Sequence, residues 1–159
     1  MIFRKPLGSI AIVPSLLAAD HARLGEAARL AERAGADWLS LDVMDGHFVP
    51  NLSFGPAHVA ALRKLTRLPL DAHLMVERPE DFIKPFADAG ADLIIVHLET
   101  CRRPRQVLDR IKALGKRAGL AIKPRTPAKA LAPFLDCIDL ALIMTVEPGA
   151  QGQPFQPTL

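Results

Sequence analysis

The sequence predicts an α/β fold in which parallel strands alternate with helices, and three observations predict it. Apolar stretches of strand length recur about once per 25 residues, with amphipathic helical patterns between them. The tetrapeptide at 34–37, Ala-Gly-Ala-Asp, returns at 89–92, each time after a helical pattern and before an apolar strand. Polar side chains gather where the strands end. Such a repeat is typical of a parallel sheet covered by helices.

The individual elements follow from these anchors in chain order. Gly35 and Gly90 stand where a helix should end in a left-handed cap, and Asp20, Ser53 and Thr126 are expected to cap helix starts. Strands are expected at 10–13, 38–43, 70–75, 93–97, 119–123 and 140–145, and helices at 22–34, 56–65, 79–89, 103–114 and 127–135.

The polar residues distinguish a barrel from a doubly wound sheet. Acidic, basic and imidazole side chains lie at or just past the C-terminal ends of separate expected strands, where a barrel of parallel strands has its active site. A dinucleotide-binding sheet would need a glycine-rich turn after its first strand, but residues 14–17 read Pro-Ser-Leu-Leu. The sequence therefore favours a (β/α)8 TIM barrel, with about six of the eight β/α units visible. The residues at the strand ends are Asp42, His73, His97, Glu99, Lys123 and Glu147.

Length and composition fit a single domain over residues 1–159, because half of the residues are hydrophobic. The net charge of +3 comes from 20 basic and 17 acidic residues scattered along the chain, which does not predict nucleic-acid binding. No segment is apolar for the ~20 residues of a membrane helix. Cys101 and Cys137 lack the spacing of a metal site and the density of a disulfide scaffold. A cytoplasmic location is expected.

The run 42–51, Asp-Val-Met-Asp-Gly-His-Phe-Val-Pro-Asn, indicates chemistry at a strand end. Strand alternation places Asp42 on the same face as Ser40 and Met44, opposite the apolar residues. A charged, unpaired carboxylate in a core would cost several kcal/mol, so Asp42 should meet a metal, a cation or a polar cavity. A hydrogen-bonded aspartate that closes a turn is the alternative.

The third expected strand adds an imidazole to this carboxylate. His73 and Met75 share one face of that strand, so Asp42 and His73 could converge. Met44, Met75 and Met144 each stand at a strand end. Methionines are commonly flexible core filler, but three around a carboxylate and an imidazole favour a polarizable, water-poor cap over a reaction centre.

Six segments in order resemble the ribulose-phosphate 3-epimerases: 13–20, 42–51, 71–76, 96–99, 121–124 and 144–149. The resemblance implies a phosphate-binding (β/α)8 barrel of the pentose phosphate pathway. Such enzymes interconvert D-ribulose 5-phosphate and D-xylulose 5-phosphate around a divalent metal such as zinc, iron, manganese or cobalt. A related barrel group that decarboxylates sugar phosphates carries Asp-x-Lys-x-x-Asp on its third strand. The matching strand here reads Asp-Ala-His at 71–73 and has no lysine.

The resemblance also implies a role for each matched residue. Inverting a carbon beside a ketone requires removing its proton from one face and returning one to the other, through an enediolate. Asp42 would be one acid/base group and also a metal ligand. His73 would be a second ligand that contacts substrate oxygens. The remaining expected substrate contacts are Ser15, the methionines Met44, Met75 and Met144, and the loop residues Gly149, Ala150, Gln151 and Gly152.

Three departures from the family pattern qualify these expectations. Ser40 stands where the family usually has a histidine ligand, and residues 148–153 read Pro-Gly-Ala-Gln-Gly-Gln instead of Pro-Gly-Phe-Gly-Gly-Gln. The family's seventh and eighth strands, which carry the opposite-face aspartate and the main phosphate site, have no counterpart among the 159 residues. We therefore expect a weakened or absent metal, and no enzymatic epimerisation by the 159-residue chain alone.

Two other interpretations stay open from the sequence. The chain could be an epimerase that acts on a six-carbon ketose 6-phosphate, because Ser15, Asp42 and His73 would serve either sugar. It could instead be an inactive, truncated family member, or an assembly subunit whose open strand edges pair with another chain. The other chain could be a second copy, which would make a homo-oligomer.

Overall fold

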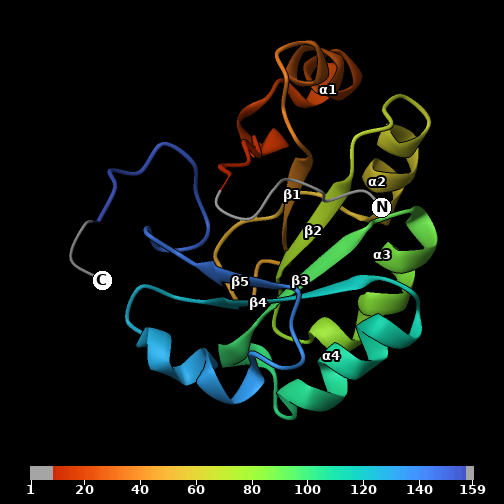
Figure 1. The fold of residues 1–159 in the computed structure, drawn as a ribbon. Helices are drawn as coiled ribbons and strands as arrows, with labels where there is room; N and C mark the ends of the chain where they lie inside the picture. Colours follow the sequence, from red (N-terminus) through yellow and green to blue (C-terminus); the bar gives the residue numbers. More distant parts are fainter. Residues whose placement is uncertain (1–8, 157–159) are drawn as a thin grey trace.

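The computed structural model describes residues 9–156. Its five strands form one parallel sheet in the order β1-β2-β3-β4-β5, the order of the chain (Figure 1). Consecutive parallel neighbours joined by helical connections are the repeat of a β/α barrel, since a doubly wound sheet would reverse its direction of winding. The strands are β1 Leu39–Met44, β2 Leu70–Met75, β3 Leu93–His97, β4 Arg117–Ile122 and β5 Leu140–Ile143.

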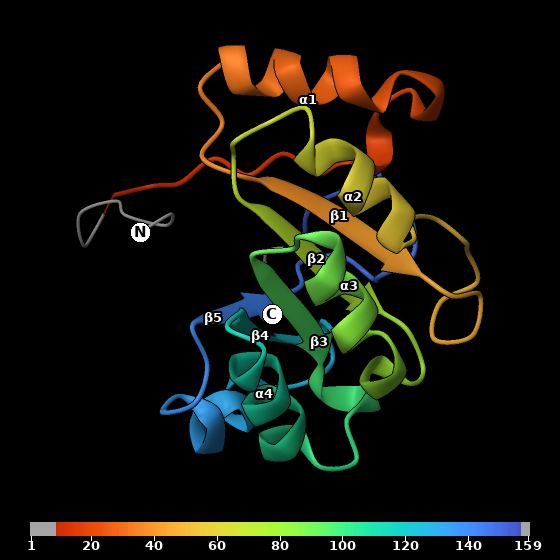
Figure 2. The same ribbon diagram turned by 90° about the vertical axis from the view of Figure 1, so that its right-hand side faces the viewer.

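Helices cover the side of the sheet on which the strands are most apolar. Figure 1 shows α2, α3 and α4 following one another around this side, with the segment after β5 on the opposite side. In Figure 2, α1 lies at the β1 end of the sheet and α4 at the β4 end. The helices are α1 Leu24–Arg33, α2 Pro56–Arg63, α3 Ile83–Ala89 and α4 Pro104–Ala113, with 3-10 turns η1 Leu16–Ala18, η2 His21–Arg23, η3 Pro79–Asp81, η4 Leu98–Thr100 and η5 Ala128–Phe134.

Three of the predicted helix signals are confirmed. The Asp20 side chain accepts a hydrogen bond from the Ala22 backbone N–H at 3.0 Å, which caps the turn before α1. Gly35 and Gly90 follow α1 and α3 with φ of 87° and 104°. This left-handed backbone releases the chain from each helix toward the next strand.

The expected cap at Ser53 is wrong. Gly55 holds the N-cap position of α2. Ser53 Oγ instead donates to the carbonyl of Asp42 and accepts from the backbone N–H of Met44 at 3.0 Å. The hydroxyl satisfies backbone groups at the end of β1, where the parallel ladder stops, and it thereby ties the loop after β1 back to the strand that carries Asp42.

The expected cap at Thr126 is also wrong, and η5 is not the α-helix expected at 127–135. Pro127 precedes η5, and Thr126 Oγ1 donates to Glu99 Oε1 at 2.6 Å. Pro133 lies inside the helical stretch, where it removes a backbone donor, so the segment forms 3-10 turns.

The first expected strand, 10–13, is not a strand of the sheet. The segment runs alongside β1, where Asp37 N–H donates to the Ile12 carbonyl at 2.9 Å and Ser40 N–H donates to the Pro14 carbonyl at 3.1 Å. A single parallel bridge joins Ser15 to Ser40. Pro14 has no N–H to continue the ladder, which explains why the pairing stays partial.

The other strand predictions agree with the structure to within two residues at each end. β4 begins two residues earlier than expected, and β5 ends at Ile143, so Met144 lies just past it. The apolar face of β1 and β2, opposite Asp42 and His73, is buried, with at most 4% exposure. Its members are Leu39, Leu41, Val43, Leu74 and Val76.

The opposite face of the sheet carries polar side chains in matched levels. Ser40 pairs with Asp71, Asp42 with His73, and Met44 with Met75 in the β1–β2 register. This register places the carboxylate of β1 beside the imidazole of β2. In residues 9–156, none of the helices is long and apolar enough to cross a membrane.

Candidate functional site

A cavity of about 240 Å³ opens where β1, β2 and β5 end. It brings together Ser15, Asp42, the three methionines expected near the reaction centre and the loop after β5. His73 is not on its wall, because the ring is 3% exposed and lies against Asp42. The lining residues are Ser15, Leu17, Ala18, Asp42, Met44, Met75, Met144 and 146–153.

The Asp42 carboxylate is held by hydrogen bonds on both oxygens. Ser15 Oγ donates to Oδ2 at 2.5 Å, and His73 Nδ1 lies 2.8 Å from Oδ1. Burial pushes the pKa of Asp42 upward, but the hydrogen bonds and charge of His73, with the hydroxyl of Ser15, outweigh it and hold that pKa below its ordinary value. Asp42 is therefore a carboxylate at neutral pH, in contact with the cavity.

His73 continues into a chain of polar groups across β2 and β3. Its Nε2 lies 2.9 Å from Nε2 of His97, and His97 Nδ1 lies 3.2 Å from Glu99 Oε2. Glu99 Oε1 accepts the backbone N–H of Lys123 at 2.7 Å. The sequence placed these residues at the catalytic end without a role. Their contact depends on the twist and register of neighbouring strands, which alternation within one strand does not reveal.

A second carboxylate lies one level below Asp42. Asp71 is 2% exposed and accepts hydrogen bonds from Trp38 Nε1 at 2.8 Å and from Ser40 Oγ at 2.7 Å. Burial raises its pKa to about 6, despite these two donors. Sequence reasoning missed this residue as part of the site. The signal was present, because Asp71 shares the inward face with His73.

The loop after β5 forms part of the wall of this cavity with residues 146–153. Asn51 Nδ2 donates to the Gly149 carbonyl at 3.0 Å, which joins this loop to the one after β1. Gly149 and Gly152 have positive φ, 125° and 74°, whereas Gln151, at the position where the resemblance implies a glycine, does not. The loop therefore forms without a left-handed conformation at Gln151.

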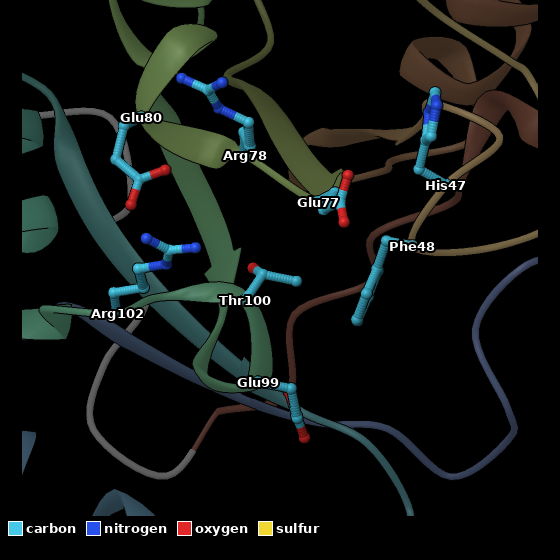
Figure 3. A pocket seen from close by; sticks show the side chains of 8 residues that line it. All are labelled: His47, Phe48, Glu77, Arg78, Glu80, Glu99, Thr100 and Arg102. Atoms are coloured by element: carbon cyan, nitrogen blue, oxygen red, sulfur yellow. The ribbon is translucent and has the colours of Figure 1, made fainter.

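A second, larger cavity of about 860 Å³ has Glu99 and His47 on its wall, whereas Glu147 lines the first cavity (Figure 3). Its wall mixes acidic and basic groups from the loops after β1, β2 and β3. His47 is exposed there and its Nδ1 lies 3.0 Å from the carbonyl of Asp45, a local turn contact. Lys123 Nζ lies 3.8 Å from the ring centroid of Phe48. The lining residues are His47, Phe48, Glu77, Arg78, Glu80, Glu99, Thr100 and Arg102.

Comparison with known proteins identifies the family. Residues 11–159 match the ribulose-phosphate 3 epimerase family. The chain belongs to this family. It is 47% identical to ribulose-phosphate 3-epimerase of Bacillus subtilis over 92% of its length, and 48% identical to that of Synechocystis over 94%. It is also 47% identical to the chloroplastic ribulose-5-phosphate-3-epimerase of Arabidopsis thaliana over 92%. The chain spans 67%, 66% and 53% of these three relatives.

Solved structures support the barrel architecture independently of close sequence similarity. The tryptophan synthase alpha chain of Legionella pneumophila superposes with a TM-score of 0.58 at 15% identity, covering 86% of this chain and 62% of its own. KGPDC from Streptococcus mutans gives a TM-score of 0.56 at 17% identity, covering 85% and 62%. At this identity the likeness concerns the fold alone. The sheet order and helices are those of a partial (β/α) barrel.

Epimerases of this family generally depend on a divalent metal. The side chains near Asp42 can therefore be compared with the ligands that such a metal needs. Asp42 Oδ1 and His73 Nδ1 are adjacent donors of suitable type, but the Ser40 hydroxyl donates to Asp71. Residues 9–156 contain no group of three or more His, Cys, Asp or Glu side chains able to hold a metal ion. A catalytic zinc takes three protein ligands. The described residues therefore do not form a complete metal site.

Proposed function

We propose that the full-length protein interconverts D-ribulose 5-phosphate and D-xylulose 5-phosphate, with Asp42 removing a proton from C3. The observation that carries the proposal is an ionised carboxylate at a cavity, held on both oxygens by Ser15 and His73. Family membership and three similar proteins that bear this enzyme's name support it. A phosphorylated ketopentose is the proposed substrate.

The chemistry of the cavity wall suits proton removal beside a ketone. A carboxylate with a depressed pKa is ready to accept a proton at neutral pH, and the Ser15 hydroxyl lies on the wall where it can reach a substrate oxygen. Met44 and Met75 are at most 4% exposed, and with Met144 they line the cavity with sulfur and methylene groups. These groups exclude water, which strengthens electrostatic interactions inside the cavity.

The return of a proton to the opposite face is not assigned to a described residue. Among those that line the cavity, Glu147 is the other titratable group. Its side chain is 51% exposed, and Oε1 lies 3.9 Å from Nε of Arg125, in contact with solvent. We infer that residues 149–152 approach the phosphate end of the substrate through their backbone amides. A cytoplasmic location stays a prediction from the sequence.

The proposal is tested by incubating the full-length protein with D-ribulose 5-phosphate in deuterated water. NMR follows deuterium at C3, and a coupled assay follows D-xylulose 5-phosphate. We expect product that carries one solvent deuteron at C3. A folded protein that gives neither exchange nor product overturns the proposal. Faster turnover of a six-carbon ketose 6-phosphate in the same assay would instead assign the site to that sugar.

A further inference from the structure

A third cavity, of about 400 Å³, is lined by η3, by α4 and by the residues that precede α4. It adjoins the larger cavity at Glu80 and Arg102, and it shares no residue with the catalytic cavity. Its volume falls in the range of small-molecule sites in proteins. Half of its wall is arginine, so we call it the arginine groove. The lining residues are Glu80, Arg102, Arg103, Gln106, Val107 and Arg110.

The sequence of α4 places its groove residues on one side of the helix. Arg103, Gln106, Val107 and Arg110 follow the spacing i, i+3, i+4 and i+7 of a single helical face. Val107 is 4% exposed and forms an apolar floor, whereas the polar side chains at the other positions are exposed. Arg103 and Arg110 stand two turns apart, about 10 Å along the helix axis. A ligand between them can therefore be contacted from both ends of the groove.

The three arginines of the groove have no acidic partner within residues 9–156. Arg105, which points away from the groove, is different, because its Nη1 and Nη2 each lie 3.1 Å from a carboxylate oxygen of Asp136. Asp109, the acidic residue of α4, does not line the groove either. Each groove guanidinium thus has N–H donors available for an anion.

The charges on the groove wall match a single dianion. Three guanidinium groups and the carboxylate of Glu80 leave a formal charge of +2. A phosphate monoester carries a charge of about −1.5 to −2 at pH 7 and three acceptor oxygens. Guanidinium groups pair with phosphate through two parallel hydrogen bonds, which a spherical anion cannot accept in the same geometry. Val107 and the Gln106 amide offer an apolar and a polar contact to a small organic group on the ester.

We propose that the arginine groove binds a small phosphate monoester at a site separate from the catalytic cavity. Arg103 and Arg110 hold the phosphate from the two ends of the groove, and Arg102 reaches it from the loop before α4. Figure 3 shows Glu80 and Arg102 facing one another across the junction of the two cavities. The Glu80 carboxylate limits the groove to one phosphate group, since it repels a second. The proposal does not rest on the epimerase function.

The test is a titration of the full-length protein with glycerol 3-phosphate, followed by NMR of 15N-labelled arginine side chains. The Nε–H signals of Arg102, Arg103 and Arg110 should shift together and saturate with one Kd of about 1 mM or tighter. Each signal is assigned by its loss in Arg102→Gln, Arg103→Gln or Arg110→Gln. Glycerol at the same concentrations should leave all three signals in place, because it lacks the charge.

Matched pairs of substitutions separate the groove from the net charge of the protein. Arg103→Gln/Arg110→Gln should weaken binding at least about 10-fold, since it removes charge-assisted hydrogen bonds to the phosphate. Arg29→Gln/Arg33→Gln changes the net charge equally, at exposed positions of α1 that do not line the groove. The affinity of this control should stay close to that of the parent protein, because solvent and salt screen distant surface charges.

Glu80→Gln gives a gain that loss of folding cannot produce. It removes the negative charge from the groove wall and keeps the shape of the side chain. We expect the affinity for glycerol 3-phosphate to rise roughly 2- to 5-fold, the size of a partly screened charge interaction at a protein surface. An affinity that falls in this variant would contradict the assigned position of the phosphate.

The other outcomes are equally decisive. Arginine signals that do not shift, or that shift to the same extent with sodium chloride at equal ionic strength, would overturn the proposal. Equal losses in the groove variant and in the α1 control would also overturn it, because net charge alone would then explain binding. Tighter binding of a short single-stranded RNA through the same arginines would assign the groove to a nucleic-acid backbone instead. Saturable binding by a parent protein without epimerase activity would support the groove and reject only the proposed function.

Discussion

Ser40 Oγ lies 2.7 Å from Asp71 Oδ1, across the register pair that joins β1 to β2. Ser40, at the position where the resemblance implies a histidine ligand, is therefore hydrogen-bonded to a buried carboxylate, one level below the Asp42–His73 pair. The other Asp71 oxygen accepts from Trp38 Nε1. This arrangement explains why the described residues offer two adjacent donors for a metal and not three.

Ser40→His should raise the affinity of the full-length protein for zinc or manganese by roughly 10-fold or more. The new imidazole would stand on the face that carries Asp42, and Asp71 is placed to accept its second ring proton. Isothermal titration with each metal measures the effect. Ser40→Ala is the control, and we expect it to leave affinity unchanged. Equal affinities for Ser40→His and the parent protein would show that position 40 does not reach the metal.

Asp42→Asn should lower turnover of D-ribulose 5-phosphate about 10²- to 10⁴-fold, because the amide keeps the shape of the carboxylate but cannot take a proton. Steady-state kinetics of the full-length protein measure the loss, with thermal unfolding as the check on folding. Glu147→Gln is the matched control, since Glu147 lines the same cavity. Its turnover should stay close to that of the parent protein. A similar loss in both variants would argue that the cavity tolerates no change of charge.

The pairing of Asp42 with His73 could be predicted from the sequence because two simple rules suffice. Alternation along a strand selects the inward residues, and parallel strands in chain order bring their C-terminal ends together. The same rules predict that the apolar face of β1 and β2 is buried. They fail for residues 10–13. Their apolar character predicts a strand, but Pro14 interrupts the hydrogen-bond ladder.

The contacts of His97 and Ser53 could not be predicted in this way. His97 lies on the expected inward face, but its contact with His73 depends on the register and twist between β2 and β3, which a single sequence does not contain. Ser53 is a good helix-capping residue, so local propensity predicts a cap. Its hydroxyl bonds the end of β1 instead, because a loop folded against a strand meets unpaired backbone groups there.

The stability of the Asp71→Asn variant, measured relative to that of the parent protein, should increase as the pH rises from 4 to 6. The Asp71 pKa is raised from 3.8 to about 6 in the native state, so in this window the folded protein binds more protons than the unfolded chain. Linkage then requires the free energy of unfolding to fall with increasing pH, by at most about 3 kcal/mol, and to level off above pH 6. Asparagine has no such titration and can bond both Trp38 and Ser40.

Urea denaturation of the parent protein and Asp71→Asn at pH 4, 5, 6 and 7.5 measures this difference. Titration of the other groups cancels when the two free energies are subtracted. We expect the advantage of the variant to grow up to pH 6 and then stay constant. A constant difference across the series would mean that Asp71 titrates at its ordinary pKa, and a difference that shrinks with pH would mean that the native state prefers the charged form.

Substitution of Gly119 measures how closely the inward face of the sheet is packed beside the histidines. A Cβ at this position would lie 2.7 Å from Cγ1 of Ile95, its register partner on β3. Gly119→Ala should therefore lower the free energy of unfolding by about 1 to 3 kcal/mol, the usual effect of overpacking a core. The source of the loss is specific, because it requires the Ile95 side chain. In an Ile95→Ala background the same substitution should be nearly neutral, so a double-mutant cycle should give a coupling of opposite sign to the single loss. Additive losses in the cycle would place the clash elsewhere and would show that β3 and β4 are less closely packed at this level.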